Sequence, residues 1–208
     1  MNIGIDIDNT LTDIEEALYI EANKYSKGLN RDFAEKEIIK YEGFTNLSKF
    51  YSEIFGWNEE NINYFFRNQR LEVVDNAKPR KYSKKVVKKL KDDGNNIYIV
   101  TARTKKFDDI PYERAKRWLD KNDIVYDKLV VGAVDKASIC KNLNIDIFID
   151  DQLNNCINLS KSGIHTIRIT NSDKVYENIV NITNWNDIYK YISNLKWLSF
   201  GRFKWKSI

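Results

Sequence analysis

Histidine and cysteine are the scarcest reactive residues of this 208-residue chain, which holds one histidine, two cysteines, one methionine and two prolines. A lone histidine provides neither a metal cluster nor a catalytic triad, and the positions of Cys140 and Cys156 match no zinc-binding pattern. We therefore expect His165, in the apolar stretch 163–169, to be structural. Both cysteines fall on short helical patterns and are expected to be reduced residues of the core.

Long apolar runs are missing as well. No stretch reaches the roughly 20 apolar residues that cross a bilayer, and no basic segment precedes the first apolar run, as it would in a signal peptide. The chain is therefore expected to be cytoplasmic, with no membrane partner. Its formal net charge of +4 favours small anionic ligands, but it is too small to imply nucleic-acid binding.

Three apolar runs of the chain end in polar side chains that can carry chemistry. Each run has the length and composition of a buried parallel strand. The first ends at Asp6 and Asp8, the second at Thr101, and the third at Asp150 and Asp151. Ligands of open α/β sheets bind at the carboxyl ends of the strands, and residues i and i+2 of a strand share one face. We therefore expect all five side chains to line one crevice.

Four carboxylates at one edge of a sheet would repel one another. Two like charges about 5 Å apart repel by about 3 kcal/mol at an effective dielectric of about 20, so the cluster needs cations to stay ionised. We predict that these cations are a lysine and a divalent metal, and hard carboxylate oxygens favour Mg²⁺ over zinc or copper. Lys136, at the start of a helical pattern, is the preferred lysine. Lys141 is the alternative because it is nearer to Asp150 in the sequence.

In order and in strand context, these residues resemble the four sequence motifs of the haloacid dehalogenase (HAD) superfamily of phosphotransferases. The motifs read here as Asp6-Ile7-Asp8-Asn9-Thr10, Thr101, Lys136 and Asp150-Asp151. The segments 101–104 and 146–152 are most similar to the nucleotidase branch that includes the 5'(3')-deoxyribonucleotidases. The resemblance implies a phosphatase whose partner is a small-molecule phosphate ester.

The resemblance also implies a catalytic role for four side chains. Asp6 would attack phosphorus and form an aspartyl phosphate, a covalent intermediate that divides the hydrolysis into two easier steps. Asp8 would act as general acid and then as general base. Thr101 would donate a hydrogen bond to the phosphoryl group, and Lys136 would neutralise the charge that develops there.

Substrate and metal contacts follow from the same resemblance. Ala102 and Arg103 would contact the substrate together with Thr101 and Lys136, although an exposed loop position for Arg103 is an equal alternative. Mg²⁺ would be bound by Asp6, by the backbone carbonyl of Asp8 and by one member of the last acidic pair. Asp151 is preferred as that ligand, with Asp150 orienting a bound water or sharing the coordination. Water would complete the coordination of the metal.

The order of the expected elements predicts an α/β fold with a doubly wound parallel sheet of Rossmann type and helices on both faces. An amphipathic helix that buries Val86, Val87 and Leu90 precedes the second strand. Residues 14–77 show no parallel-strand pattern and are rich in helix formers. We expect them to form a small helical cap inserted after the first strand, with residues 1–13 and 78–208 as the core.

Aromatic residues are abundant in the expected cap. They are Phe44, Phe50, Tyr51, Phe55, Trp57, Tyr64, Phe65 and Phe66. At helical spacing most of them should pack in the core of the cap itself, and one or two should face the crevice, where an aromatic ring can stack on a base. The cap is therefore expected to select the substrate.

The predicted function is that of a Mg²⁺-dependent phosphomonoesterase, which acts through an aspartyl phosphate on (deoxy)ribonucleoside monophosphates. One alternative is a HAD phosphatase for another small phosphorylated metabolite. A phospho-accepting receiver protein is a second, but the acidic pair after the lysine favours turnover over storage of a phosphoryl group. A non-catalytic nucleic-acid-binding protein is a third, because segment 197–206 mixes basic and aromatic residues. The oligomeric state is left open.

Overall fold

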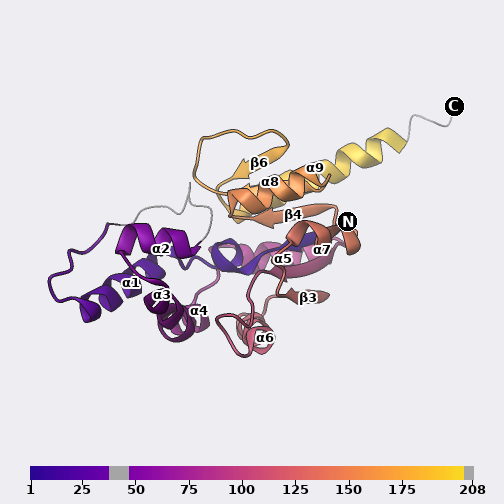
Figure 1. The fold of residues 1–208 in the computed structure, drawn as a ribbon. Helices are drawn as coiled ribbons and strands as arrows, with labels where there is room; N and C mark the ends of the chain where they lie inside the picture. Colours follow the sequence, from indigo (N-terminus) through magenta and orange to yellow (C-terminus); the bar gives the residue numbers. More distant parts are fainter. Residues whose placement is uncertain (38–46, 204–208) are drawn as a thin grey trace.

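The computed structural model describes residues 1–37 and 47–203. At its centre lies a six-stranded parallel sheet with the order β3-β2-β1-β4-β5-β6 (Figure 1). The strands are β1 (Asn2–Ile5), β2 (Asn96–Thr101), β3 (Lys128–Val131), β4 (Ile147–Asp150), β5 (His165–Ile169) and β6 (Ile179–Ile182). This order, which starts in the middle and winds outward in both directions, is doubly wound. It confirms the predicted fold class.

Helices pack on both faces of the sheet. On one face, α5 (Ser83–Asp92), α6 (Pro111–Lys121) and α9 (Trp185–Phe203) share a core with the strands, and the predicted inward residues Val86, Val87 and Leu90 are buried there. On the other face lie α7 (Lys136–Asn142) and α8 (Leu153–Lys161). Among the described helices, none is both long and apolar enough to cross a membrane.

The second face of the sheet depends on a glycine in β1. A Cβ atom built on Gly4 would lie 2.3 Å from Cδ2 of Phe148 in β4, far inside van der Waals contact. Glycine therefore allows the Phe148 ring to lie directly over β1. Cys140 is buried in the same cluster, and both it and Cys156 are free and buried, as expected for packing residues.

The loop before β3 is fixed by an aspartate. Asp127 Oδ2 accepts a hydrogen bond from the amide of Ile97 at 2.7 Å, and its other oxygen pairs with Lys91. Burial alone would raise the pKa of Asp127. The hydrogen bonds from Lys91 and Ile97 lower the pKa by more than burial raises it, so the pKa lies below its ordinary value of 3.8. Asp127 therefore connects α5, β2 and β3 most strongly when it is ionised.

The lone histidine begins β5 and faces the C-terminal helix. His165 Nε2 lies 2.9 Å from the hydroxyl of Tyr191, and the two rings stack with centroids 5.6 Å apart. Burial lowers the pKa of His165 below its usual value of 6.5. This environment agrees with the structural role that we expected.

Between β1 and α5 the chain forms a helical region, residues 15–76, which lies beside the sheet (Figure 1). It consists of α1 (Glu15–Leu29), α2 (Leu47–Phe55), α3 (Glu59–Tyr64), the π-helical turn η2 (Phe65–Gln69) and α4 (Arg70–Asn76). Its core is aromatic: Tyr19, Phe50, Tyr51, Phe55, Trp57, Phe65 and Phe66 are buried together. Of the aromatics that we expected there, Tyr64 is exposed and Phe44 lies outside the described residues. A separate core fits the expected cap, and the domain division stays a proposal.

The two segments that connect the helical region to the sheet lie side by side. Thr12 and Pro79 form an antiparallel bridge, and the amide of Arg80 donates to the carbonyl of Leu11 at 2.6 Å. The Arg80 side chain reaches further back, with Nη2 2.9 Å from the carbonyl oxygen of Asn9. The helical region is thus joined to the sheet through one narrow, hydrogen-bonded neck.

Candidate active site

A cavity of about 320 Å³ opens at the carboxyl ends of β1, β2 and β4. It lies where the strand order reverses between β1 and β4, the switch point at which doubly wound sheets bind ligands. Side chains of the helical region complete its wall. The predicted site residues that line it are Asp6, Asp8, Thr101, Ala102, Arg103, Lys136, Asp150 and Asp151. The structure therefore brings the whole predicted set together.

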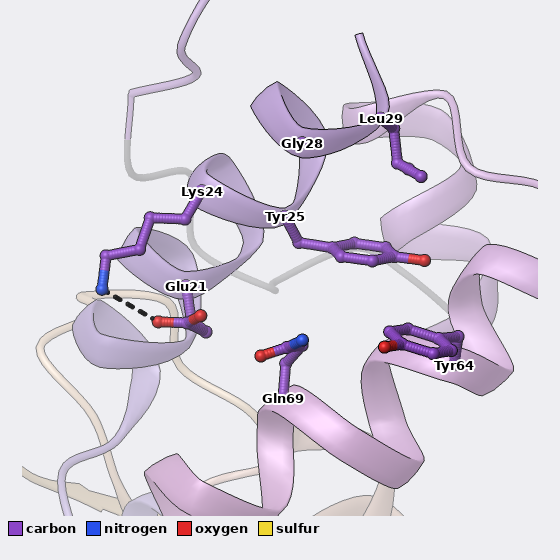
Figure 2. Close-up of a pocket in the computed structure, with 7 residues that line it drawn as sticks. All are labelled: Glu21, Lys24, Tyr25, Gly28, Leu29, Tyr64 and Gln69. Carbon is purple, nitrogen blue, oxygen red and sulfur yellow. Dashed lines mark hydrogen bonds and ion pairs between the residues drawn. The ribbon is translucent and has the colours of Figure 1, made fainter.

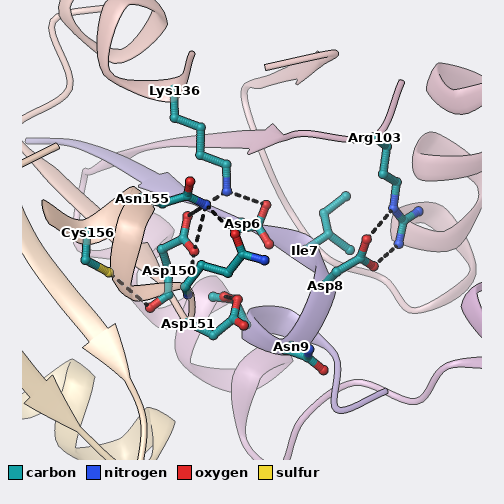
Figure 3. A network of polar contacts seen from close by, with 12 residues as sticks. Asp6, Ile7, Asp8, Asn9, Arg103, Lys136, Asp150, Asp151, Asn155 and Cys156 are labelled. Atoms are coloured by element: carbon teal, nitrogen blue, oxygen red, sulfur yellow. Dashed lines mark hydrogen bonds and ion pairs between the residues drawn. The ribbon is translucent and has the colours of Figure 1, made fainter. Parts of the chain in front are cut away.

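Lys136 connects two of the acids. Its Nζ lies 2.8 Å from Asp6 Oδ1 and 2.6 Å from Asp150 Oδ2 (Figure 3). Lys136 is buried because it begins α7 directly above the strand ends, whereas Lys141, near the end of the same helix, is exposed. The geometry thus selects Lys136 from the two lysines that the sequence left open.

The charges of Asp6 and Lys136 depend on each other. Burial raises the pKa of Asp6, Lys136 lowers it, and Asp150 and Asp8 raise it again, which gives a pKa of about 6. Burial would lower the pKa of Lys136, but Asp150 and Asp6 more than reverse this and hold it above its ordinary value. Lys136 is therefore a permanent cation at neutral pH, and it keeps Asp6 mostly ionised.

Asp150 is held in place by more donors than Lys136 alone. Its Oδ1 accepts from the amide of Gln152 at 2.9 Å, and the side-chain amide of Asn155 lies 3.1 and 3.3 Å from its two oxygens. We did not predict Asn155 from the sequence. The feature that could have indicated its role is its position in the first turn of α8, just after the acidic pair Asp150-Asp151. Because these donors contact both oxygens, the Asp150 carboxylate is fixed in place and suited to position Lys136.

Asp8 reaches the cavity by a route that we did not expect. The strand ends at Ile5 and not at Asp8, and a kinked turn over Ile7–Leu11 follows. In this turn Asp8 has an extended backbone (φ −71°, ψ 126°) and Asn9 a left-handed φ of 57°. The Asp8 side chain is therefore positioned by the turn, outside the hydrogen-bonded strand. Asp6 and Asp8 line the same cavity but have different partners.

Two arginines hold the Asp8 carboxylate. Arg103 Nη2 and Nε lie 2.6 and 3.2 Å from its two oxygens, and Arg70 Nη2 lies 3.1 Å from Oδ2. Burial raises the pKa of Asp8, but Arg103 and Arg70 lower it to about 2. Arg103 is buried and not an exposed loop residue. Arg70, from α4, was not predicted, because no motif marks it.

The acids form two groups instead of the single cluster that we predicted. Within the described part of the chain, no set of three or more acidic, histidine or cysteine side chains is arranged to hold a metal. Lys136 pairs with Asp6 and Asp150, whereas the two arginines pair with Asp8. The four carboxylates thus line one cavity, as we expected, but they divide between two sets of cationic partners, and the bound metal stays a prediction.

The Asp151 carboxylate differs from the other three acids of the site, because no ion pair joins it to a cationic side chain within the described residues. Its Oδ1 accepts from the hydroxyl of Thr10 at 3.2 Å, and burial, Asp150 and Asp6 together raise its pKa well above the ordinary value. A cation beside Asp151 and Asp6 would relieve this charge. Mg²⁺ is usually bound by only one or two carboxylates with several waters. The residues present therefore fit this ion, even without a preformed set of three acids.

Thr101 and Ala102 end β2 at the cavity. Thr101 is the last residue of the strand, is buried, and lines the cavity together with Ala102. The carbonyl of Thr101 accepts a hydrogen bond from the amide of Ala133 at 2.9 Å, which fixes the backbone at this point. The hydroxyl is thus placed beside the acids by a rigid strand end.

A second hollow lies in the helical region (Figure 2). It is lined by Glu21, Lys24, Tyr25, Gly28, Leu29, Tyr64 and Gln69. Tyr25 stacks on Tyr64 with ring centroids 5.6 Å apart. Its two charged residues, Glu21 and Lys24, pair with each other at 3.1 Å, so the hollow offers no uncompensated charge for a phosphate.

Comparison with known proteins identifies the family of this chain. Residues 1–198 match the family model described as 5' nucleotidase, deoxy (pyrimidine), cytosolic type C protein. The chain belongs to this family. A nucleotidase of Clostridium acetobutylicum is 31% identical over 199 residues, which cover 94% of this chain and 95% of that protein. The predicted resemblance to HAD nucleotidases is therefore confirmed, and the protein is an enzyme of the phosphatase and nucleotidase class.

Solved structures of HAD proteins share the fold of this nucleotidase-family chain. The haloacid dehalogenase-like hydrolase SP0104 of Streptococcus pneumoniae superposes with a TM-score of 0.66 and 13% identity, and covers 92% of this chain and 97% of that one. A Clostridium acetobutylicum structure named as a predicted phosphatase gives a TM-score of 0.66 and 21% identity, with 93% and 98% covered. At these identities the likeness confirms the HAD-type fold.

Proposed function

We propose that this nucleotidase-family protein is a Mg²⁺-dependent phosphomonoester hydrolase that acts through phosphorylation of Asp6. The observation that supports this most is the buried Asp6 carboxylate, which is paired with Lys136 at the switch point of the sheet. Asp8, two residues later, lines the same cavity. Phosphoryl transfer needs an in-line nucleophile, positive charge near the transferring oxygens, and a proton for the leaving group. The cavity holds a candidate for each.

The first displacement forms a covalent enzyme. A carboxylate oxygen of Asp6 attacks phosphorus, and the bond from phosphorus to the ester oxygen breaks. Asp8 is ionised in the free site, because Arg103 and Arg70 lower its pKa to about 2. It therefore takes up a proton when the anionic substrate binds beside it, and it gives this proton to the departing ester oxygen. Lys136 and the hydroxyl of Thr101 stabilise the charge on the phosphoryl oxygens. The alcohol leaves, and Asp6 carries the phosphoryl group.

The second displacement restores the enzyme. Asp8, now ionised, takes a proton from a water molecule, which attacks phosphorus and breaks the bond to Asp6. Inorganic phosphate leaves. Asp6, Asp151 and the backbone carbonyl of Asp8 would hold Mg²⁺, which supplies positive charge to the phosphoryl oxygens when it is bound. Asp150 and Asn155 keep Lys136 in place during both steps.

The substrate that we propose is a nucleoside monophosphate. Family membership supports this, as do the aromatic residues Tyr51, Phe66 and Phe107, which line the cavity together with the acids and can contribute apolar surface for a base. The cavity of about 320 Å³ is near the lower end of the usual range for small-molecule sites, which favours a compact substrate. We also propose that the enzyme works in the cytoplasm.

Phosphate release from a panel of esters tests this function. The panel contains ribonucleoside and deoxyribonucleoside 5'-monophosphates, sugar phosphates and an aryl phosphate, each with Mg²⁺ and with a chelator. We expect Mg²⁺-dependent release, fastest with the nucleotides, and none from Asp6→Asn. If nucleotides are no better than the aryl ester, the nucleotidase assignment is wrong. If Asp6→Asn keeps the normal rate, the covalent route is wrong.

A further inference from the structure

Two arginines from distant parts of the chain meet beside Asp8. Arg103 follows β2, while Arg70 is the first residue of α4 in the helical region. Both donate to the Asp8 carboxylate. The Arg70 guanidinium also lies over the ring of Phe66, 5.5 Å from its centroid. One carboxylate thus has two guanidinium partners, although the two-point contact of Arg103 alone is enough to neutralise it.

One nitrogen of Arg103 has no partner. The side chain of Arg103 is only 4% exposed, and its Nη1 is buried without a hydrogen-bond acceptor among the described residues. Because Nε and Nη2 both face Asp8, Nη1 points away from it, on the side opposite Asp6 and Lys136 (Figure 3). A buried donor without an acceptor is costly. Because Arg103 lines the cavity, an acceptor that a ligand brings to this guanidinium would relieve that cost.

The charges on this side of the cavity do not balance. This side is lined by Arg70, Arg103, Arg114, Asp8 and Asp108, and the remaining charged lining residues are Asp6, Lys136, Asp150 and Asp151. Arg114 is compensated, because it pairs with Asp108 at 2.7 Å and also with Asp75. Arg70 and Arg103, in contrast, share the one carboxylate of Asp8. These two guanidinium groups therefore keep an excess of positive charge.

We propose that Arg70 and Arg103 form a second oxyanion-binding subsite, which selects phosphate esters whose leaving group carries another anionic group, either a phosphate or a carboxylate. The proposal rests on the proposed phosphatase function, because that function places Asp8 at the ester oxygen. Arg103 lies beyond Asp8 as seen from Asp6 (Figure 3), and Arg70 pairs with the same carboxylate. The subsite therefore faces the leaving group and not the transferred phosphoryl group. Guanidinium groups match the planar, two-point geometry of both kinds of oxyanion. Arg70 is then a specificity-determining residue that the helical region contributes.

Matched pairs of substrates test the subsite. The first pair is a nucleoside 3',5'-bisphosphate and the corresponding 5'-monophosphate. The second is a carboxymethyl phosphate and a 2-hydroxyethyl phosphate, and an aryl phosphate serves as the reference. For the intact enzyme we expect kcat/KM to be roughly 10- to 100-fold higher for the doubly anionic member of at least one pair, the factor that a charge-assisted contact provides. The pair that responds identifies the second group as phosphate or carboxylate.

Variants of two arginines in the helical region provide the comparison. Arg70→Gln should reduce the preference for the doubly anionic member to about one, and Arg70→Lys should restore part of it. Arg67→Gln is the matched control, because Arg67 lies in the preceding turn, is half-exposed and pairs only loosely with the exposed Asp109 at 3.7 Å. This control should keep the preference. Circular dichroism and thermal unfolding check that each variant is folded.

Several outcomes would overturn the proposal. It fails if the intact enzyme shows no preference within either pair, or if Arg70→Gln keeps the preference. If no ester releases phosphate, the proposed function fails instead, and calorimetry then tests the subsite alone. In that case a nucleoside 3',5'-bisphosphate should bind the intact protein at least about tenfold more tightly than Arg70→Gln does. Equal binding would overturn the subsite.

Discussion

Replacing Lys136 by methionine should both destabilise the protein and stop turnover. The Lys136 ammonium lies 2.8 Å from Asp6 and 2.6 Å from Asp150, and its side chain is 4% exposed. Removing one partner of a buried ion pair costs about 3–5 kcal/mol, because the remaining charge is left uncompensated. Protonation of Asp6 limits this cost, so we expect about 3 kcal/mol. Protonation of Asp6 also removes the nucleophilic carboxylate, so phosphate release should be lost.

Urea unfolding measures this loss of stability. With a slope of about 2 kcal/mol per molar urea, a loss of about 3 kcal/mol lowers the midpoint by about 1.5 M. Lys141→Met, on the exposed side of the same helix, should change stability by less than about 0.5 kcal/mol. Adding Asp150→Asn to Lys136→Met removes a second charge and should recover part of the stability. Equal effects of the two lysine variants would refute the reasoning.

Three further changes have defined outcomes. Asn155→Ala removes a donor to both oxygens of Asp150, so kcat should fall roughly tenfold with little change in KM; initial rates that show only a KM effect would contradict this. Gly4→Ala places a Cβ against Phe148 and should cost about 1–3 kcal/mol in urea unfolding, a cost that should mostly disappear in a Phe148→Leu background. The pKa of Asp127 in the folded state is below its ordinary value of 3.8. Ionised Asp127 therefore stabilises the fold at a pH above 3.8, and this stabilisation is lost as the pH falls through the folded-state pKa. Asp127→Asn should therefore destabilise at neutral pH, and unfolding curves at falling pH should show its deficit shrinking below a pH of about 4.

The sheet and its acidic edge could be predicted because short-range patterns determine them. Buried parallel strands appear in the sequence as apolar runs, and the residue after each run must lie at the edge of the sheet where ligands bind. This places Asp6, Thr101 and Asp150 without knowledge of the strand order. β6 was not predicted, because this short edge strand carries Asn181 between its apolar residues and lacks a clear run.

The contacts of the site could not be predicted in the same way, because they depend on packing between distant elements. Arg70 is 62 residues from Asp8, in a helix whose position relative to the sheet no sequence pattern fixes. Asn155 acts through one turn of α8. The separation of the acids into two groups follows from these partners, and counting carboxylates alone could not show that Arg70 and Arg103 neutralise Asp8.

The narrow neck between the sheet and the helical region has an evolutionary consequence. Because Thr12 bridges Pro79, the chain leaves the sheet and returns to it at nearly the same place. Insertions, deletions or whole replacements between these two points can then accumulate without moving the strand ends. A lineage with this architecture can thus exchange the part that recognises a substrate while it inherits the phosphate chemistry intact, which is a simple route from one ancestral enzyme to many specificities.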